Sequence, residues 1–390
     1  MKHADRRFDI VVYGATGYTG RLVAEYLAHH YAGAGPKWAM AGRSAEKLAA
    51  VRDLIGAPAD TPLIVADADD AASMAALAQS ARVVITTVGP YQLYGEPLLA
   101  ACVAAGTDYA DLCGEPVWMR LMIDRYDAAA KASGARITFS CGFDSIPFDL
   151  GVLMLQIEAK ARFGAPAPRV KGRMRSMSGK FSGGTAASLK ASLAALAKDP
   201  SLMPYMLSPF GLTPGFEGPP QPRGDRPEYD ESLGSWTTPF IMAAINVKNV
   251  HRTNLLLGHP YGADFAYDEM VLTGPGEGGE AAAKDMARTP MIGGPNDPKP
   301  GEGPTPEERE NGFYDVLFVG EYPDGRSIRY SVKGRYDPGY GSTSRMISET
   351  AIALLASDHA GGIGTPGAFL GAALTERLRD HAEIAYAVEA

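Results

Sequence analysis

The chain has 390 residues, of which 46% are hydrophobic and 21% are charged, as in globular proteins. Its formal net charge of −8 argues against a general nucleic-acid-binding surface. Its polar N-terminus lacks a signal-peptide apolar region, and no apolar run reaches the ~18 residues of a membrane span, so we expect a cytoplasmic protein. The cysteines and histidines lack metal-ligand spacing, so no metal site is expected.

The first predicted elements surround a glycine-rich turn. The apolar run 8–13 predicts a strand, and the apolar spacing over 21–27 predicts a helix. A strand, a glycine turn and a helix form the arrangement that binds a dinucleotide diphosphate, because the backbone can approach the phosphates and the helix N-terminus faces them. The spacing here is G-x-x-G-x-x-G rather than G-x-G-x-x-G. The expected cofactor contacts are Gly14, Thr16, Gly17, Tyr18, Thr19 and Gly20.

The strand–helix alternation continues to about residue 146. Five further strands are predicted, each after a predicted helix: 37–41, 62–67, 82–88, 107–112 and 136–140. Six such units predict an α/β fold with a Rossmann-type doubly wound parallel sheet. We therefore assign residues 1–146 to a dinucleotide-binding domain.

The pattern changes after residue 146. Apolar and polar residues alternate over 169–177, 314–320 and 327–333, and the last two segments flank a hairpin turn signal at 322–326. These segments predict an antiparallel sheet in a second, α+β domain spanning 147–340. Two stretches rich in glycine and proline predict long loops at about 200–236 and 274–311. Residues 341–390 are expected to form C-terminal helices that pack back on the core.

The ends of the predicted strands indicate which cofactor binds. NAD-binding domains usually carry a carboxylate after the second strand, but Arg43 follows it here. An arginine can bind a ribose 2′-phosphate, so the sequence predicts NADP. Asp67, after the third strand, either contacts the adenine end or simply leads the next helix. After the fourth strand, Val88, Gly89 and Pro90 are expected to pass close to the nicotinamide.

Further motifs follow in order along the chain. They are Val88-Gly-Pro-Tyr91, Tyr94-Gly-Glu96, Gly106-Thr-Asp-Tyr-Ala-Asp-Leu112, Gly114-Glu115, Gly142-Phe-Asp-Ser-Ile-Pro-Phe-Asp-Leu-Gly151, Ser182-Gly-Gly-Thr185, Asp337-Pro-Gly-Tyr340 and Thr365-Pro366. With the glycine turn and Ala41-Gly-Arg43, they resemble the saccharopine dehydrogenase-like oxidoreductases, specifically the branch that holds the trans-acting enoyl reductases of mycobacterial lipid synthesis. The resemblance implies a saccharopine-reductase-like second domain and a reductase of lipid-like, thioester-bound substrates in (glyco)lipid biosynthesis.

Reduction of an enoyl thioester needs a proton donor as well as a hydride. Tyr91 and Tyr94 follow the fourth strand and are candidate donors, or else pack beneath the loop. Asp144 and Ser145 follow the sixth strand and either act on substrate or cap the next helix. Glu115 is either an acid in the cleft or a carboxylate at a helix N-terminus. Ser182 and Thr185 are candidate substrate contacts, although their position before an Ala/Leu-rich helix favours an N-terminal cap.

The segment 201–212 is unusually apolar and carries Met203, Met206 and Phe210. It is a candidate wall for a lipid tunnel or a peripheral membrane contact, or it packs on its own domain. The sequence is also compatible with a homodimer. Two other functions stay open: a nucleotide-sensing or scaffold protein without turnover, and a saccharopine-type amino-acid dehydrogenase.

Overall fold

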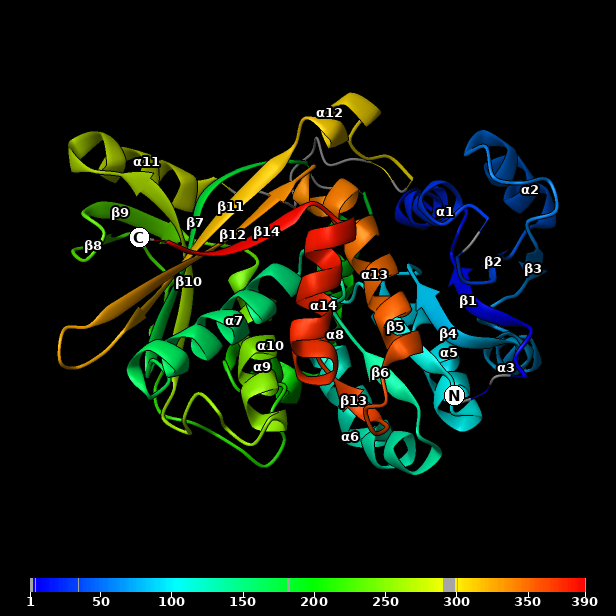
Figure 1. The fold of residues 1–390 in the computed structure, drawn as a ribbon, viewed down its shortest axis with the longest axis horizontal. Coiled ribbons are helices and arrows are strands. Elements are labelled where there is room, and N and C mark those ends of the chain that lie inside the picture. The colour runs from blue at the N-terminus through cyan, green and yellow to red at the C-terminus, as the bar shows by residue number, and fades with distance from the viewer. Residues whose placement is uncertain are drawn as a thin grey trace.

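The computed structural model describes residues 3, 5–33, 35–180, 183–289, 299 and 301–389. Two seven-stranded sheets form its framework, and Figure 1 shows them at opposite ends of the molecule with helices packed between them. The predicted α/β fold with a second α+β domain is confirmed. No helix in the described part of the chain is long and apolar enough to cross a membrane.

The first sheet is entirely parallel, in the order β13-β6-β5-β4-β1-β2-β3. Its strands are β1 (Phe8–Tyr13), β2 (Trp38–Gly42), β3 (Leu63–Val65), β4 (Ala81–Thr86), β5 (Asp108–Asp111), β6 (Arg136–Thr138) and β13 (Gly362–Gly364). The first six are the predicted strands in Rossmann order. The seventh comes from the C-terminal region, where only helices were predicted.

Helices cover both faces of this sheet, so its strands are apolar on both sides. On β1, Ile10 and Val12 join the core on the side of α1 (Tyr18–His30), whereas Val11 and Tyr13 join the core on the other side. The remaining helices of this part are α2 (Ala45–Leu54), α3 (Ala71–Ser80), α4 (Tyr91–Tyr94), α5 (Glu96–Ala105) and α6 (Pro116–Ser133).

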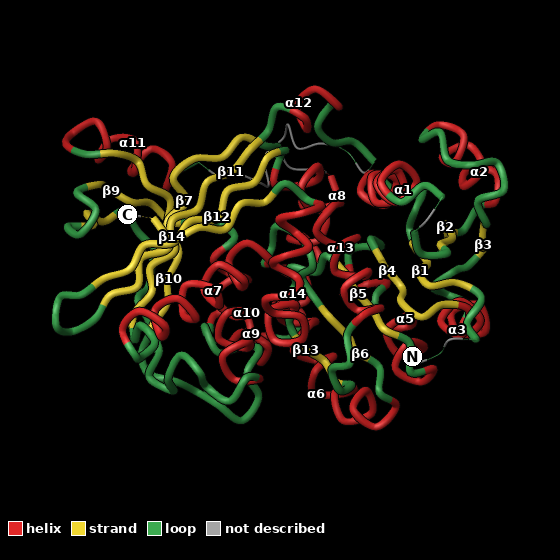
Figure 2. The backbone as a smooth tube through the Cα atoms, viewed as in Figure 1, coloured by secondary structure: helices red, strands yellow, loops and turns green. Residues whose placement is uncertain are grey.

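The second sheet has the order β14-β12-β11-β7-β10-β9-β8 (Figure 2). Its strands are β7 (Arg169–Ser178), β8 (Glu228–Asp230), β9 (Ser235–Pro239), β10 (Ala266–Gly274), β11 (Phe313–Glu321), β12 (Ser327–Arg335) and β14 (Ile384–Glu389). The hairpin between β11 and β12 forms at the predicted turn. The expectation of a purely antiparallel sheet was wrong, since β7 and β10 pair in parallel. The long helical crossover between them permits this direction.

Several helices connect or cover the second sheet. They are α7 (Ile146–Phe163), α8 (Gly183–Lys198), η1 (Pro200–Leu202), α9 (Met203–Leu207), α10 (Ala243–Leu256), α11 (Gly276–Arg288), α12 (Pro306–Glu310), η2 (Pro338–Ser342), α13 (Thr343–Ala356) and α14 (Pro366–His381). Figure 1 shows α13 and α14 between the two sheets. Residues of both helices belong to the larger hydrophobic core.

In their described residues, the two predicted long loops contain more helix and strand than expected. The first contains α9 and β8, and the second contains α11 and α12. Three glycines in the sequence of α11 lower its helix propensity. The helix nevertheless forms because Ala283 is buried, with its carbonyl accepting a hydrogen bond from Thr238, and an ion pair joins Glu280 to Lys284 one turn apart.

Candidate functional site

The glycine turn has the close contacts that a diphosphate cradle requires. Gly14 adopts φ +90°, and a Cβ there would lie 2.7 Å from Val88 Cγ2. A Cβ on Gly20 would collide with the carbonyl oxygen of Gly14. Gly17, the N-cap residue of α1, has no side chain to cap the helix, and no acid lies in the first turn of α1. Its free N–H groups and positive dipole end therefore fit the diphosphate of a dinucleotide.

Arg43 and Asp67 lie together at the adenine end of this edge. Arg43 is exposed directly after β2 and makes no hydrogen bond or ion pair with any described residue. Asp67 follows β3, and its Oδ1 accepts a hydrogen bond from the Asp69 amide at 3.2 Å. Both charges act on the buried Tyr13, whose pKa is raised by burial and by Asp67 and lowered by Arg43. An exposed, unpaired arginine here fits the 2′-phosphate of NADP.

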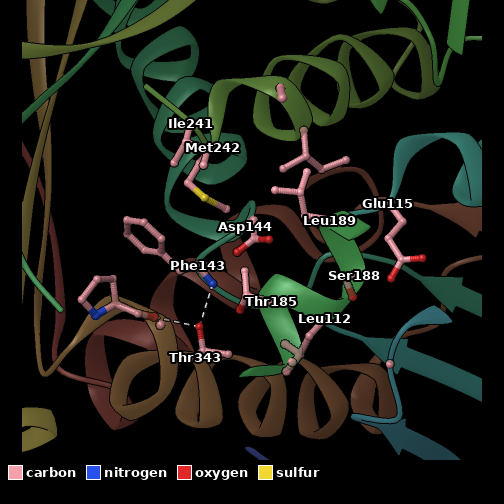
Figure 3. Close-up of a pocket in the computed structure, with 18 of the residues that line it drawn as sticks. Leu112, Glu115, Phe143, Asp144, Thr185, Ser188, Leu189, Ile241, Met242 and Thr343 are labelled. Atoms are coloured by element: carbon pink, nitrogen blue, oxygen red, sulfur yellow. Dashed lines mark hydrogen bonds between the residues drawn. The ribbon is translucent and has the colours of Figure 1, made fainter. Parts of the chain in front are cut away.

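A cavity of about 350 Å³ continues from this edge into the second domain (Figure 3). Its floor comes from strand ends of the first sheet, at Thr87, Gly89, Leu112 and Gly142. Its other walls are formed by α8, by the start of α10 and by the η2 turn. Figure 3 shows Asp144, Thr185, Met242 and Thr343, from four separate segments, around this space.

The two tyrosines that were candidate proton donors lie in different environments. Tyr91 is fully buried, and its ring lines the cavity. Its hydroxyl donates to the Thr86 carbonyl and accepts from the Leu112 amide, both at 3.1 Å. This hydroxyl therefore joins the ends of β4 and β5. Tyr94 is 46% exposed and is not among the described residues that line the cavity.

Glu115 is a capping carboxylate at the cavity wall. Its two oxygens accept hydrogen bonds from the backbone amides of Tyr91 (2.9 Å) and Gln92 (2.8 Å), at the start of α4. Burial raises its pKa, and bonds from these amides and from Ser188 oppose the rise. Both oxygens thus bind amides of α4, whereas the Glu115 side chain does not cap α6, the helix that it precedes in the chain.

Asp144 and Ser145 are neighbours in the chain but face different surroundings. Asp144 lines the cavity without an ion-pair partner among the described residues, and burial raises the pKa of its carboxyl to about 6. A carboxyl with this pKa can hold a proton near neutral pH. Ser145 is 2% exposed and does not line the cavity, and its hydroxyl accepts a hydrogen bond from Asn249 at 2.8 Å. Ser145 therefore packs behind the wall.

Among the candidate substrate contacts, Thr185 faces the cavity and Ser182 lies outside the described residues. The Thr185 hydroxyl lies 3.2 Å from that of Tyr340, a lining residue without an assigned role in the sequence analysis. Asp337 accepts hydrogen bonds from the amides of Tyr340 (2.9 Å) and Gly341 (2.8 Å). The Asp337-Pro-Gly-Tyr340 motif was the only available signal for this part of the site.

The apolar segment 201–212 divides between two environments. Met206 lines the cavity. Phe210 is 8% exposed and packs against Phe216 and His251, with ring centroids 5.7 and 4.5 Å away. Met203 and Leu207 are exposed. One methionine of this segment thus reaches the cavity, whereas its phenylalanine belongs to the core of its own domain.

Comparisons with known proteins agree with this geometry. A model of the saccharopine dehydrogenase NADP-binding domain matches residues 10–137. A putative trans-acting enoyl reductase of Mycobacterium tuberculosis is 42% identical, and the alignment covers 97% of both chains. A trans-acting enoyl reductase of Mycobacterium bovis is 37% identical with the same coverage. Among solved structures, apo saccharopine dehydrogenase (L-Glu forming) from Saccharomyces cerevisiae is similar in fold, with a TM-score of 0.53 and 11% identity over 98% of this chain and 100% of that one.

Proposed function

Because this chain belongs to the trans-acting enoyl reductases, within the saccharopine dehydrogenase-like oxidoreductases, we propose that it reduces the carbon–carbon double bond of a lipid-like enoyl thioester in (glyco)lipid biosynthesis. The chain is an NADP-dependent oxidoreductase, and the proposal concerns its substrate. The main support for this substrate is the set of charged and apolar side chains that form the cavity wall.

That wall offers no free cation to a substrate carboxylate. Lys180 is the one lysine or arginine among the described lining residues, and it forms an ion pair with Glu308. The same wall carries the acids Asp144 and Glu115. An amino acid or a 2-oxo acid would need a cationic partner for each carboxylate. The wall therefore favours an uncharged acyl group over the substrates of a saccharopine-type amino-acid dehydrogenase.

The apolar part of the wall reaches the protein surface. Met206, Met242 and Phe240 line the cavity together with Leu189 and Ile241, which are 39% and 37% exposed. A cavity of about 350 Å³ accepts the reacting end of a ligand rather than a long chain. Leu189 and Ile241 give the remainder of an acyl chain an apolar path toward the surface.

NADPH held by the glycine turn and Arg43 would supply the hydride that the β-carbon of the enoyl thioester requires. The resulting enolate must then receive a proton at its α-carbon. Asp144 is suited to supply it, because its carboxyl lines the cavity and burial raises its pKa to about 6. The hydroxyls of Thr185 and Tyr340 are placed at the same cavity to donate a hydrogen bond to the thioester oxygen.

Consumption of NADPH with a panel of substrates tests this proposal. We expect oxidation with enoyl thioesters and a KM that falls as the acyl chain lengthens. Turnover only with an amino acid and a 2-oxo acid would instead identify an amino-acid dehydrogenase. Tight NADPH binding without any turnover across the panel would favour a nucleotide sensor.

A further inference from the structure

The segment that immediately precedes β11 contacts the cofactor turn. We name residues 301–312, which include α12, the strap; in Figure 1 its yellow trace leads from α12 toward the blue α1. A Cβ on Gly303 would lie 2.6 Å from Tyr18 Cζ, so the strap packs directly on that ring. The Tyr18 hydroxyl donates to the Pro304 carbonyl and accepts from Arg309 Nη1 at 3.0 Å. Tyr18 is the first residue of α1, so the strap holds the turn at its N-terminus.

The strap is also fixed to the far wall of the cavity. The Asp337 amide donates to the Arg309 carbonyl at 2.9 Å, and Glu308 pairs with Lys180. A capping box between Thr305 and Glu308 orders the start of α12. The strap thus spans from the η2 turn of the second domain to the phosphate turn of the first.

Two guanidinium groups lie beside the Tyr18 ring, where the strap meets α1. The Cζ atoms of Arg21 and Arg309 lie 5.6 and 5.9 Å from the centroid of the Tyr18 ring. Neither arginine forms an ion pair with a carboxylate in the described part of the chain, and both are only partly exposed. The nearby Asp337 offsets part of the Arg309 charge, since burial raises the pKa of its carboxyl and Arg309 opposes this rise. The carboxylate oxygens of Asp337 nevertheless accept hydrogen bonds from the Tyr340 and Gly341 amides.

Two like charges over one ring repel each other unless an anion lies near. They also stand beside the positive end of α1, which has no acid in its first turn. This excess of positive charge at a nucleotide turn is complementary to a diphosphate, which carries two negative charges. Without a bound anion, Arg309 donates only to the Tyr18 hydroxyl and the Pro304 carbonyl among the described residues, and Arg21 has no carboxylate there within ion-pair distance.

We propose that Arg309, together with Arg21, binds the diphosphate of NADP, so that the strap contributes a cofactor ligand from outside the dinucleotide-binding domain. The inference rests on NADP dependence and is independent of the substrate. Arg309 contacts the diphosphate, which NADPH and NADH share, whereas Arg43 is placed for the 2′-phosphate, which only NADPH carries.

The experiment is a fluorescence titration of the full-length apo protein with NADPH and NADH, without any acyl substrate. We expect R309A to weaken both cofactors about tenfold, the size of one charge-assisted hydrogen bond. The NADPH-to-NADH affinity ratio should stay at the wild-type value, and the dependence of NADPH affinity on salt should become shallower. R326A is the matched control, since Arg326 pairs with Asp324 on the exposed β11–β12 hairpin and should leave both affinities unchanged.

The variant R309Q separates charge from positioning. Glutamine can still donate to the Tyr18 hydroxyl and the Pro304 carbonyl but carries no charge. The proposal requires R309Q to lose affinity as R309A does, with R309K retaining most of it. Wild-type affinity and salt dependence in R309Q would overturn the proposal and leave the strap a structural support. Melting temperatures of all variants identify any loss that stems from unfolding.

Discussion

The hydroxyls of Tyr340 and Thr185 lie 3.2 Å apart and join two walls of the cavity. Thr185 belongs to α8, and Tyr340 belongs to the η2 turn that Asp337 holds in place. The Tyr340 ring also meets the Tyr18 ring edge-on, with centroids 5.1 Å apart. One tyrosine therefore contacts both the cofactor turn and the substrate wall.

Replacing Tyr340 with phenylalanine keeps that ring contact and removes the hydroxyl. If the hydroxyl donates to the thioester oxygen, Y340F should lower kcat by about tenfold to a hundredfold. The dissociation constant of NADPH should change little, because the ring remains. T185V should show a smaller loss in kcat. A loss of NADPH affinity that equals the loss in kcat would assign Tyr340 to cofactor binding instead.

Asp144 should make the reaction rate and the stability of the folded protein depend on pH in the same direction. Burial raises the pKa of its carboxyl from 3.8 to about 6, so only the protonated form, present below that pH, can donate. Single-turnover rates should fall as pH rises through about 6, and D144N should lose this limb and react about a hundredfold more slowly.

The same shift predicts a stability measurement. A carboxyl whose pKa is raised on folding stabilises the folded state fully below its unfolded pKa, and this contribution is lost as pH rises through the folded pKa. The increase in Tm from wild type to D144N should therefore be larger at pH 8 than at pH 5. An equal difference at both pH values would show that the Asp144 carboxyl is not desolvated.

Arg43 should decide between the two cofactors. R43A should weaken NADPH binding by about tenfold or more and leave NADH binding nearly unchanged, because only the 2′-phosphate loses a partner. K47A, an exposed lysine one turn into α2, is the control and should alter neither affinity. Equal affinities of the wild-type protein for NADPH and NADH would contradict the role of Arg43.

The glycine turn offers a steric test. G20A places a methyl group against the Gly14 carbonyl oxygen, so NADPH binding should fall sharply and Tm should drop. G278A is the matched change, since α11 leaves open space there and alanine favours a helix. Titration and thermal melting of both variants should separate them clearly.

Met206 should affect long acyl chains more than short ones. M206S removes apolar wall from the cavity, so KM should rise several-fold for a long-chain enoyl thioester while NADPH affinity stays constant. L207S, the exposed neighbour at 71% exposure, should leave KM unchanged. A rise in KM for L207S as well would point to a role of the whole segment at the surface.

The first sheet was largely predictable because its strands are short buried apolar runs separated by glycines. β13 was missed, since Gly362-Ile363-Gly364 has little strand propensity and extends only because β6 offers an open parallel edge. The helix α11 was not predicted, because its three glycines have low helix propensity. Local sequence therefore indicated the first six strands of this sheet. The added strand β13 depends on the free edge of β6, a strand more than 200 residues earlier in the chain.

The site residues also fall into a group that the sequence predicted and a group that it did not. Gly14, Arg43 and Gly89 follow predicted strands, and strand ends must meet at one edge, so their common location was expected. Tyr340 and Thr185 meet through contacts between segments more than 150 residues apart, which no local pattern encodes. The bonding of the Tyr91 hydroxyl to two backbone groups likewise depends on the packing of β4 against β5.

The last 29 residues place one strand in each sheet: β13 lies beside β6, and β14 lies beside β12. A protein shortened before residue 362 would therefore leave the edges of β6 and β12 without their partner strands, one in each sheet. Division of the chain at residue 146 would likewise leave the first domain without β13, and its edge strand β6 would be exposed. A ribosome releases residues 362–389 after the segments that they pair with, so both sheets remain unfinished, and open to pairing with another chain, until these residues emerge.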